Sequence, residues 1–282
     1  MSLVSTDWLE KNLKKVKLID CSWHLPNSKR NPYKEYIDGH IPNAIFFDLD
    51  KNSDQNTDLP HMLPNKNSWE KILSSMGISN EDNIIIYDNS DLISSCRCWY
   101  TFIYFGHNPK LVSILNGGLK KWKLENKLIS NNTIKINKSS YVAKENKELV
   151  KDKNQIDENI LKKRFKVIDA RSKARFDGKE KEPREGIRSG SIPNSYCLPF
   201  KELINKNYTF KEKNEISKKF KNILKSEISS NVVFSCGSGV TAAVLALAYS
   251  LIDNTYRPVL YDGSWAEYGK DWYMKASKKI LS

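Results

Sequence analysis

Short runs of β-branched and aromatic residues alternate with longer apolar segments along the whole chain. The short runs have the length of buried strands and lie at 18–23, 83–87, 167–172 and 232–234. The longer segments have helical length and lie at 69–76, 94–105, 215–224 and 240–252. Strands that alternate with helices predict an α/β fold, with a mainly parallel sheet flanked by helices.

Four cassettes occur twice in the same order, at a period of about 148 residues. In the first half they read LID, GHIPNA, NIIIY and LVSILNGGLKKW, and in the second VID, GSIPNS, NVVFS and PVLYDGSWAEY. A period of this length is that of a whole domain, not of a solenoid unit. Because residues 130–146 are rich in Asn, Lys and Ser and have little periodicity, we expect domains at 1–137 and 147–282 and a linker at 138–146.

The loop CGSGVT at 236–241 joins the last predicted strand to the most apolar predicted helix. A turn of this kind directs several backbone N–H groups and a helix N-terminus into one concavity, which favours a thiolate at its head. Gly237 and Gly239 let the backbone curl around the sulfur. We therefore predict that Cys236 is a nucleophile that carries a sulfur atom, held by the N–H groups from Gly237 and Gly239 to Val240 and Thr241. The alternative is a buried structural cysteine, which a thiol sealed from solvent would favour.

Two comparisons argue against a phosphatase site and against a second nucleophile in the first half. A phosphatase loop that begins with cysteine needs an arginine six positions later, where Ala242 stands, and no basic residue lies between Cys236 and Thr241. When the two repeats are aligned, Asp88 falls on Cys236, and the glycines of the loop are missing from the first half. A carboxylate cannot serve as a sulfur nucleophile, so we predict that the first domain is inactive.

Composition excludes several other classes of protein. No apolar run reaches the ~18–20 residues of a membrane span, and the N-terminal residues lack the pattern of a signal peptide. Five cysteines without the spacing of a metal site favour a reducing compartment, so we expect a cytoplasmic protein with no metal and no organic cofactor. The net charge of +13 comes from dispersed lysines and not from a compact basic block, which argues against nucleic acid and suits a small anionic substrate.

These features resemble the rhodanese superfamily of sulfurtransferases in its tandem form. The likeness covers nearly the whole chain and implies two rhodanese-like domains, with a persulfide on Cys236. A small-molecule donor would supply the sulfur, and a thiol, a thioredoxin-like dithiol or cyanide would accept it. The loop is similar to that of the branch that uses 3-mercaptopyruvate and releases pyruvate. Relatives that use thiosulfate carry two basic residues where Gly237 and Ser238 stand here.

The resemblance also implies roles for residues outside the loop. Arg175 and Arg184 match the substrate-binding arginines of the family, and arginine can hold a carboxylate through two bonds. Ser238, His61 and Asp50 match a Ser–His–Asp relay that would handle the proton of the substrate thiol or polarise its carbonyl. Since His61 and Asp50 come from the first half, this interpretation predicts a site at the domain interface. The alternatives are solvated loop arginines, a capped loop histidine and a turn aspartate.

Two other functions remain open at this stage. One is a thiosulfate:cyanide sulfurtransferase, which performs the same reaction with another donor. The other is a non-catalytic carrier that receives a persulfide from a desulfurase. Turnover measured on both small donors separates these possibilities.

Overall fold

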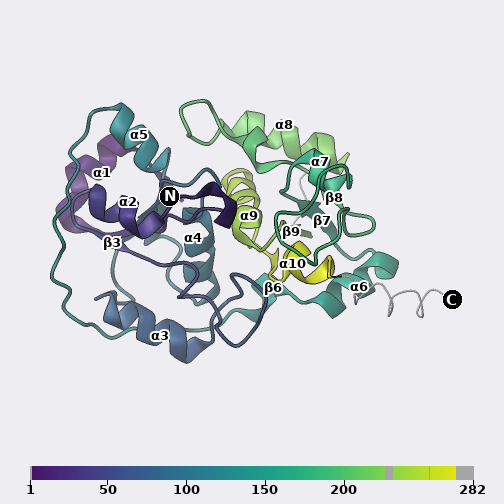
Figure 1. Cartoon of the computed structure of the whole chain (residues 1–282), viewed down its shortest axis with the longest axis horizontal. Helices are drawn as coiled ribbons and strands as arrows, with labels where there is room; N and C mark the ends of the chain where they lie inside the picture. The colour runs from purple at the N-terminus through teal and green to yellow at the C-terminus, as the bar shows by residue number, and fades with distance from the viewer. Residues whose placement is uncertain (1, 226–230, 254, 271–282) are drawn as a thin grey trace. The chain divides into compact units, whose positions relative to one another are not determined.

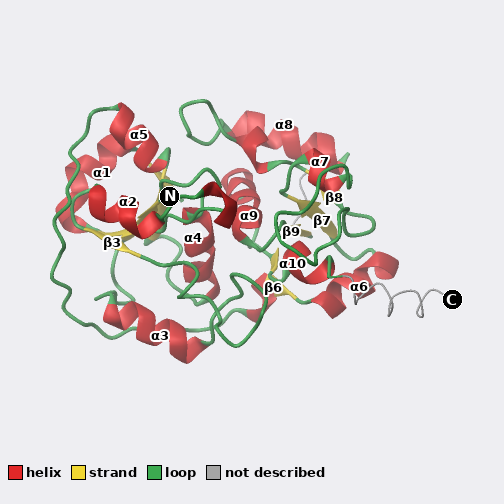
Figure 2. Cartoon of the chain, viewed as in Figure 1, coloured by secondary structure: helices red, strands yellow, loops and turns green. Residues whose placement is uncertain are grey.

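The computed structural model describes residues 2–225, 231–253 and 255–270, which form two compact units (Figure 1). Unit 1 comprises the described residues up to Asn56, Leu63–Lys147 and Ile204–Lys211. Unit 2 comprises Thr57–Met62, Glu148–Leu203 and the described residues from Glu212 on. Each unit contains one five-stranded sheet flanked by helices (Figure 2), which confirms the predicted α/β class and its duplication.

The sheet of unit 1 has the strand order β1-β5-β4-β2-β3, and all of its pairs are parallel. The strands are β1 (Leu3–Val4), β2 (Lys17–Asp20), β3 (Ala44–Phe46), β4 (Ile84–Tyr87) and β5 (Val112–Leu115). The helices are α1 (Thr6–Asn12), α2 (Pro32–Asp38), α3 (Lys66–Ser75), α4 (Ser95–Tyr104) and α5 (Gly118–Leu124), with 3-10 turns η1 (Leu13–Lys15) and η2 (Pro26–Ser28).

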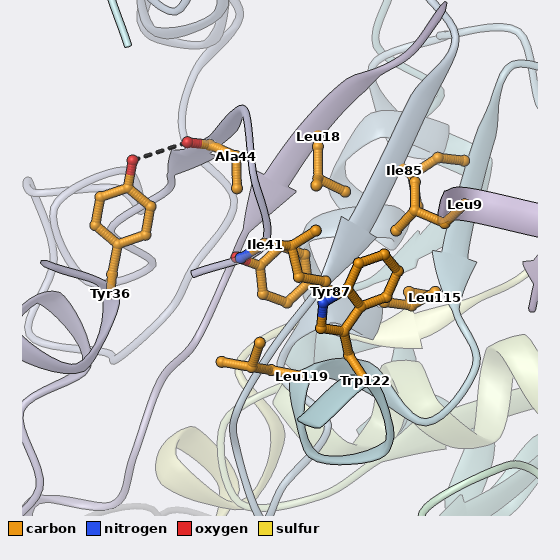
Figure 3. Close-up of a cluster of buried hydrophobic side chains, with 10 residues drawn as sticks. All are labelled: Leu9, Leu18, Tyr36, Ile41, Ala44, Ile85, Tyr87, Leu115, Leu119 and Trp122. Atoms are coloured by element: carbon orange, nitrogen blue, oxygen red, sulfur yellow. Dashed lines mark hydrogen bonds between the residues drawn. The ribbon is translucent and has the colours of Figure 1, made fainter. Parts of the chain in front are cut away.

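One hydrophobic cluster shows how the sheet of unit 1 binds its helices (Figure 3). Leu18 of β2, Ile85 of β4 and Leu115 of β5 are each 1% exposed and belong to one cluster with Leu9 of α1 and Trp122 of α5. Burying an aliphatic side chain of this size stabilises a fold by about 1.5–3 kcal/mol. The short runs in the sequence are therefore strands because they supply this core.

The sheet of unit 2 repeats the same arrangement with the order β6-β10-β9-β7-β8, again with parallel pairs. The strands are β6 (Val150–Lys151), β7 (Lys166–Asp169), β8 (Tyr196–Cys197), β9 (Val232–Ser235) and β10 (Leu260–Tyr261). The helices are α6 (Lys153–Lys162), α7 (Lys173–Phe176), α8 (Lys213–Leu224), α9 (Val240–Ile252) and α10 (Ser264–Tyr268), with 3-10 turns η3 (Lys147–Leu149) and η4 (Phe200–Leu203).

Equivalent backbone hydrogen bonds show that the duplication extends to single residues. The N–H of Leu119 donates to the carbonyl of Asp88 at 2.9 Å, and the N–H of Trp265 donates to the carbonyl of Cys236 at 2.9 Å. In unit 1 the bond joins the residue after the central strand β4 to the start of α5. In unit 2 it joins the residue after the central strand β9 to the start of α10. Asp88 and Cys236 therefore occupy equivalent positions, as the sequence alignment of the repeats predicts.

In unit 1 the side chain of Asp88 fills its own loop. One carboxylate oxygen accepts the N–H of Ser90 at 2.8 Å, and the other accepts the N–H of Ser95, the first residue of α4, at 3.0 Å. Burial raises the pKa of Asp88, and the bonds from Ser95 and Ser90 oppose that rise. The carboxylate of Asp88 thus takes up the first N–H of α4, and the inactivity of the first domain stays a prediction.

Asp20, at the end of β2, is a buried carboxylate. Its side chain accepts the N–H of Ser22 at 2.9 Å and the Ser22 hydroxyl at 2.5 Å, and no cation pairs with it within the described part of the chain. Burial raises the pKa of Asp20 to about 6, partly offset by the bonds from Ser22. Between its unfolded pKa near 4 and about 6, the folded state holds the extra proton, so stability falls as the pH rises through this window.

Replacing Asp20 by asparagine is expected to raise the free energy of unfolding at pH 7.5 by up to the order of 3 kcal/mol. The amide oxygen can still accept both bonds from Ser22, and no charge has to be buried. The measurement is urea unfolding of both proteins at pH 5 and pH 7.5, and the gain should be smaller at pH 5. Equal pH dependence in the two proteins would contradict the assignment.

Candidate active site

The candidate site begins where β9 ends and α9 starts. β9, labelled in Figure 1, lies between β10 and β7 in the sheet, and Cys236 directly follows its last residue, Ser235. The carbonyls of Cys236 and Gly237 accept the N–H groups of Trp265 at 2.9 Å and Ala266 at 2.8 Å. These bonds to α10 fix the loop through its carbonyl groups.

The N–H groups of the same loop are left for another partner. Gly239 caps α9 with a φ of +78°, a conformation that favours glycine. Within the described residues, the N–H groups of Gly237, Gly239, Val240 and Thr241 have no hydrogen-bond acceptor. Unsatisfied donors at the start of a 13-residue helix form a place where an anion can be held. That they hold the outer sulfur of a persulfide stays a prediction.

Cys236 itself is closed off from solvent in this structure, with 1% of its surface exposed. The sequence interpretation requires a reachable thiol, so this conformation differs from that expectation. Ser238, two residues later, is 5% exposed, whereas the side chain of Arg175 beside the loop is 18% exposed. This burial favours the alternative of a structural cysteine, and the role of Cys236 as a nucleophile stays a prediction.

The two predicted substrate-binding arginines lie beside the loop. A Cβ atom built on Gly237 would stand 3.2 Å from Nη2 of Arg175 and 3.7 Å from Nη1 of Arg184. Nη2 of Arg184 also donates to the hydroxyl of Ser238 at 3.3 Å. Without a side chain at 237, both guanidinium groups approach the backbone, and a basic side chain there would compete with them for the same space.

His61 meets Ser238 within unit 2. Although His61 precedes the predicted linker in the sequence, it belongs to the segment Thr57–Met62, which is part of this unit. Its side chain is buried, its φ is +60°, and Nδ1 lies 2.9 Å from the hydroxyl oxygen of Ser238. With Arg184 donating to that oxygen, the hydroxyl proton can point to Nδ1 in the tautomer that carries hydrogen on Nε2. The pair can then pass a proton.

Asp50, the third member of the predicted relay, belongs to unit 1. Both of its carboxylate oxygens accept the indole N–H of Trp23 at 3.0 Å. Its predicted bond to His61, and with it a site at the domain interface, stays a prediction.

One residue that the sequence interpretation missed holds the backbone of the cysteine. The hydroxyl of Ser264 accepts the N–H of Cys236 at 3.2 Å and donates to the carbonyl of Tyr261 at 2.9 Å. Ser264 is fully buried and has a φ of +49°, close to the +55° of Gly118 at the equivalent position of unit 1. A serine that keeps a left-handed conformation where the other repeat has glycine is the signal that could have revealed it.

In residues 2–225, 231–253 and 255–270, no group of three or more His, Cys, Asp or Glu side chains could hold a metal ion. The helices in the same ranges include none with the length and apolar character needed to cross a membrane.

Comparison with known proteins identifies relatives along nearly the whole chain. A family model of the rhodanese-like domain matches residues 5–125 and 144–271, one match in each half. The 3-mercaptopyruvate sulfurtransferase of Mus musculus is 39% identical, over 99% of this chain and 94% of the relative. Thiosulfate/3-mercaptopyruvate sulfurtransferase 1, mitochondrial, of Arabidopsis thaliana is 38% identical, over 94% of this chain and 75% of the relative.

A solved structure shows the same similarity in three dimensions. The crystal structure of a 3-mercaptopyruvate sulfotransferase from Escherichia coli matches with a TM-score of 0.82 and 32% sequence identity. The match covers 94% of this chain and 99% of the other. Both halves of the chain are thus accounted for by one known architecture.

Proposed function

Because the chain belongs to the rhodanese-like family and is a sulfur-transferring enzyme, we propose that it moves the sulfur of 3-mercaptopyruvate to a thiol or cyanide through a persulfide on Cys236, with release of pyruvate. The predicted family and the tandem fold are confirmed. The donor, the persulfide and the roles of single residues belong to the proposal.

The hydroxyl of Ser238 is the observation that carries the proposal. It lies two residues after Cys236 and contacts both His61 and Arg184. 3-Mercaptopyruvate has a thiol proton and a keto oxygen that such a hydroxyl can serve, and a carboxylate that an arginine can hold. Thiosulfate has neither a thiol proton nor a keto group, so the hydroxyl and imidazole would have no role with that donor.

In the first half-reaction, the thiolate of Cys236 attacks the sulfur of 3-mercaptopyruvate and an S–S bond forms. The C–S bond breaks, and its electron pair leaves with the carbon as the enolate of pyruvate. Ser238 and a neighbouring guanidinium stabilise the developing oxyanion by donating hydrogen bonds to it. The proton of the substrate thiol ends on the methyl carbon of pyruvate, and the enzyme keeps a deprotonated persulfide.

In the second half-reaction, a thiolate or cyanide attacks the outer sulfur of the persulfide. The S–S bond breaks, and its electron pair returns to Cys236 as the thiolate. The acceptor leaves with the sulfur, as a persulfide or as thiocyanate. Such a two-stage covalent scheme predicts ping-pong kinetics. A thioredoxin-like dithiol is the acceptor that we propose for the cell.

The test is to incubate the protein with 3-mercaptopyruvate, remove the small molecules and measure the intact mass. We expect a gain of one sulfur atom in the wild type and no gain in Cys236→Ser. Cys197→Ser is the matched control and should keep the gain, because burial raises the pKa of the Cys197 thiol to about 12 and makes it a poor nucleophile. Persistence of the added mass in Cys236→Ser would overturn the assignment.

The choice of donor needs a separate measurement, since the Arabidopsis thaliana relative is named for both donors. We expect a higher kcat/KM with 3-mercaptopyruvate than with thiosulfate when cyanide is the acceptor. A higher value with thiosulfate would reverse the choice of donor. A persulfide on Cys236 without turnover of either donor would favour a carrier.

A further inference from the structure

Asp169, at the end of β7, begins a line of alternating charges that leads to the active-site loop. Nε and Nη2 of Arg171 donate to the Asp169 carboxylate, at 3.0 Å and 2.7 Å to Oδ2. Nη2 of Arg171 also donates to the carbonyl of Gly190 at 2.8 Å, and its guanidinium lies 4.6 Å from the ring centroid of Trp265. Arg171 is 2% exposed, so these contacts fix its guanidinium in the core of unit 2.

Glu182 is the next member of the line. Its side chain is 4% exposed, and its Oε1 accepts a bond from Nη1 of Arg171 at 2.7 Å. The same carboxylate accepts Nε of Arg175 at 3.2 Å on Oε1 and Nη2 of Arg175 at 2.5 Å on Oε2. Glu182 therefore joins a buried guanidinium to the one that lies beside the loop.

These bonds occupy only one edge of Arg175. A guanidinium group can bind a carboxylate through its Nε/Nη2 edge or through its Nη1/Nη2 edge. Glu182 takes the first edge, and within the described residues Nη1 of Arg175 has no acceptor. Nη2 lies 3.2 Å from where a Cβ of Gly237 would be, so this end of the guanidinium stands next to the loop.

We propose that Glu182 is a positioning residue that holds Arg175 with its Nη1/Nη2 edge presented to the carboxylate of the sulfur donor. The identity of that donor rests on the proposed function. A guanidinium already fixed by Glu182 loses little conformational freedom when the substrate binds. Glu182 thereby makes the site selective for donors with a planar carboxylate.

The kinetic test uses Glu182→Gln and Glu182→Asp. The neutral amide of glutamine and the shorter carboxylate of aspartate both lose the double bridge, so we expect KM for 3-mercaptopyruvate to rise roughly three- to tenfold in each variant, with kcat within about twofold. The direction of the change in KM separates positioning from charge, because Glu182→Gln makes the site more positive. If Glu182 acted only through its charge, that variant would lower KM, and Glu182→Asp would leave it unchanged. Either result would overturn the proposal.

Glu180→Gln is the matched control. Glu180 lies in the same loop and is exposed, and among the described residues its carboxylate accepts a bond only from the hydroxyl of Ser172, at 3.2 Å. The Glu180→Gln substitution removes the same charge without breaking a bond to a guanidinium, so KM for 3-mercaptopyruvate should not change. If Glu182→Gln does not fold, Glu182→Asp keeps the negative charge between the two arginines and decides the question alone.

A second measurement is independent of the donor. The rates at which iodoacetate and neutral iodoacetamide alkylate Cys236 are compared by peptide mass spectrometry. The ratio of the iodoacetate rate to the iodoacetamide rate reports carboxylate binding near the sulfur, and it should fall roughly three- to tenfold in both Glu182 variants and stay constant in Glu180→Gln. An unchanged ratio and an unchanged KM overturn the proposal. If the wild type does not turn over 3-mercaptopyruvate but the ratio still falls in both Glu182 variants, the proposed donor is wrong and the role of Glu182 is supported.

Discussion

Replacing Ser238 by alanine is expected to lower kcat/KM for 3-mercaptopyruvate about 10²–10³-fold, the effect of removing one donor to a developing oxyanion. The hydroxyl of Ser238 lies 2.9 Å from Nδ1 of His61 and 3.3 Å from Nη2 of Arg184, and in the proposed reaction its proton turns from His61 to the enolate oxygen. Formation of the persulfide from thiosulfate should change only a few-fold, because that donor has no keto group and no thiol proton. The measurement is steady-state kinetics with each donor and cyanide.

Ser250→Ala is the control for this substitution. Ser250 lies on α9, the helix that follows the loop of Ser238, and its hydroxyl donates to the carbonyl of Leu247 at 2.7 Å, within the helix. It should retain both activities. An equal loss with the two donors in Ser238→Ala would mean that Ser238 only holds the loop, and the assignment of the hydroxyl to the chemistry of an α-keto acid would fall.

The elements that the sequence predicted best are those with strong local signals. The helix predicted at 240–252 is α9, because Gly239 supplies the left-handed residue at its start and its first ten residues are buried on all sides. The helix predicted at 94–105 is α4, Ser95–Tyr104. The two-residue strands β1 and β6 gave no signal, since pairing with β5 and β10 creates them.

For the site, the sequence predicted which residues gather and not how they are joined. Arg175, Arg184, Ser238 and His61 lie around the loop of Cys236, but the position of His61 in unit 2 depends on tertiary packing. The loop that carries Arg184 contains three glutamates, Glu180, Glu182 and Glu185, and their spacing does not tell which one turns inward. Glu182 bonds to the guanidinium groups of both Arg171 and Arg175, and this is the bridge that we propose positions Arg175.

The equivalent aspartates at the ends of β2 and β7 show how two repeats came to differ in charge. Asp20 is followed by serine at position 22 and stays without a cation in the described part of the chain, whereas Asp169 is paired with Arg171. In unit 1 the buried carboxylate therefore costs stability at neutral pH, and in unit 2 it orients the first guanidinium of the line that leads to Glu182. One position thus carries a carboxylate bonded to serine in one repeat and a carboxylate paired with a guanidinium in the other.

Replacing Asp169 by asparagine is accordingly expected to lower the free energy of unfolding at pH 7.5 by about 3 kcal/mol, the lower end of the cost of breaking a buried ion pair, because Glu182 still contacts Arg171. The same substitution at Asp20 should raise it. Urea unfolding gives both values, and hydrogen exchange in β7 and β2 locates each effect in its own unit. If both substitutions changed stability in the same direction, burial and not the paired guanidinium would determine how these carboxylates affect stability. Asp169 would then have no role in orienting Arg171.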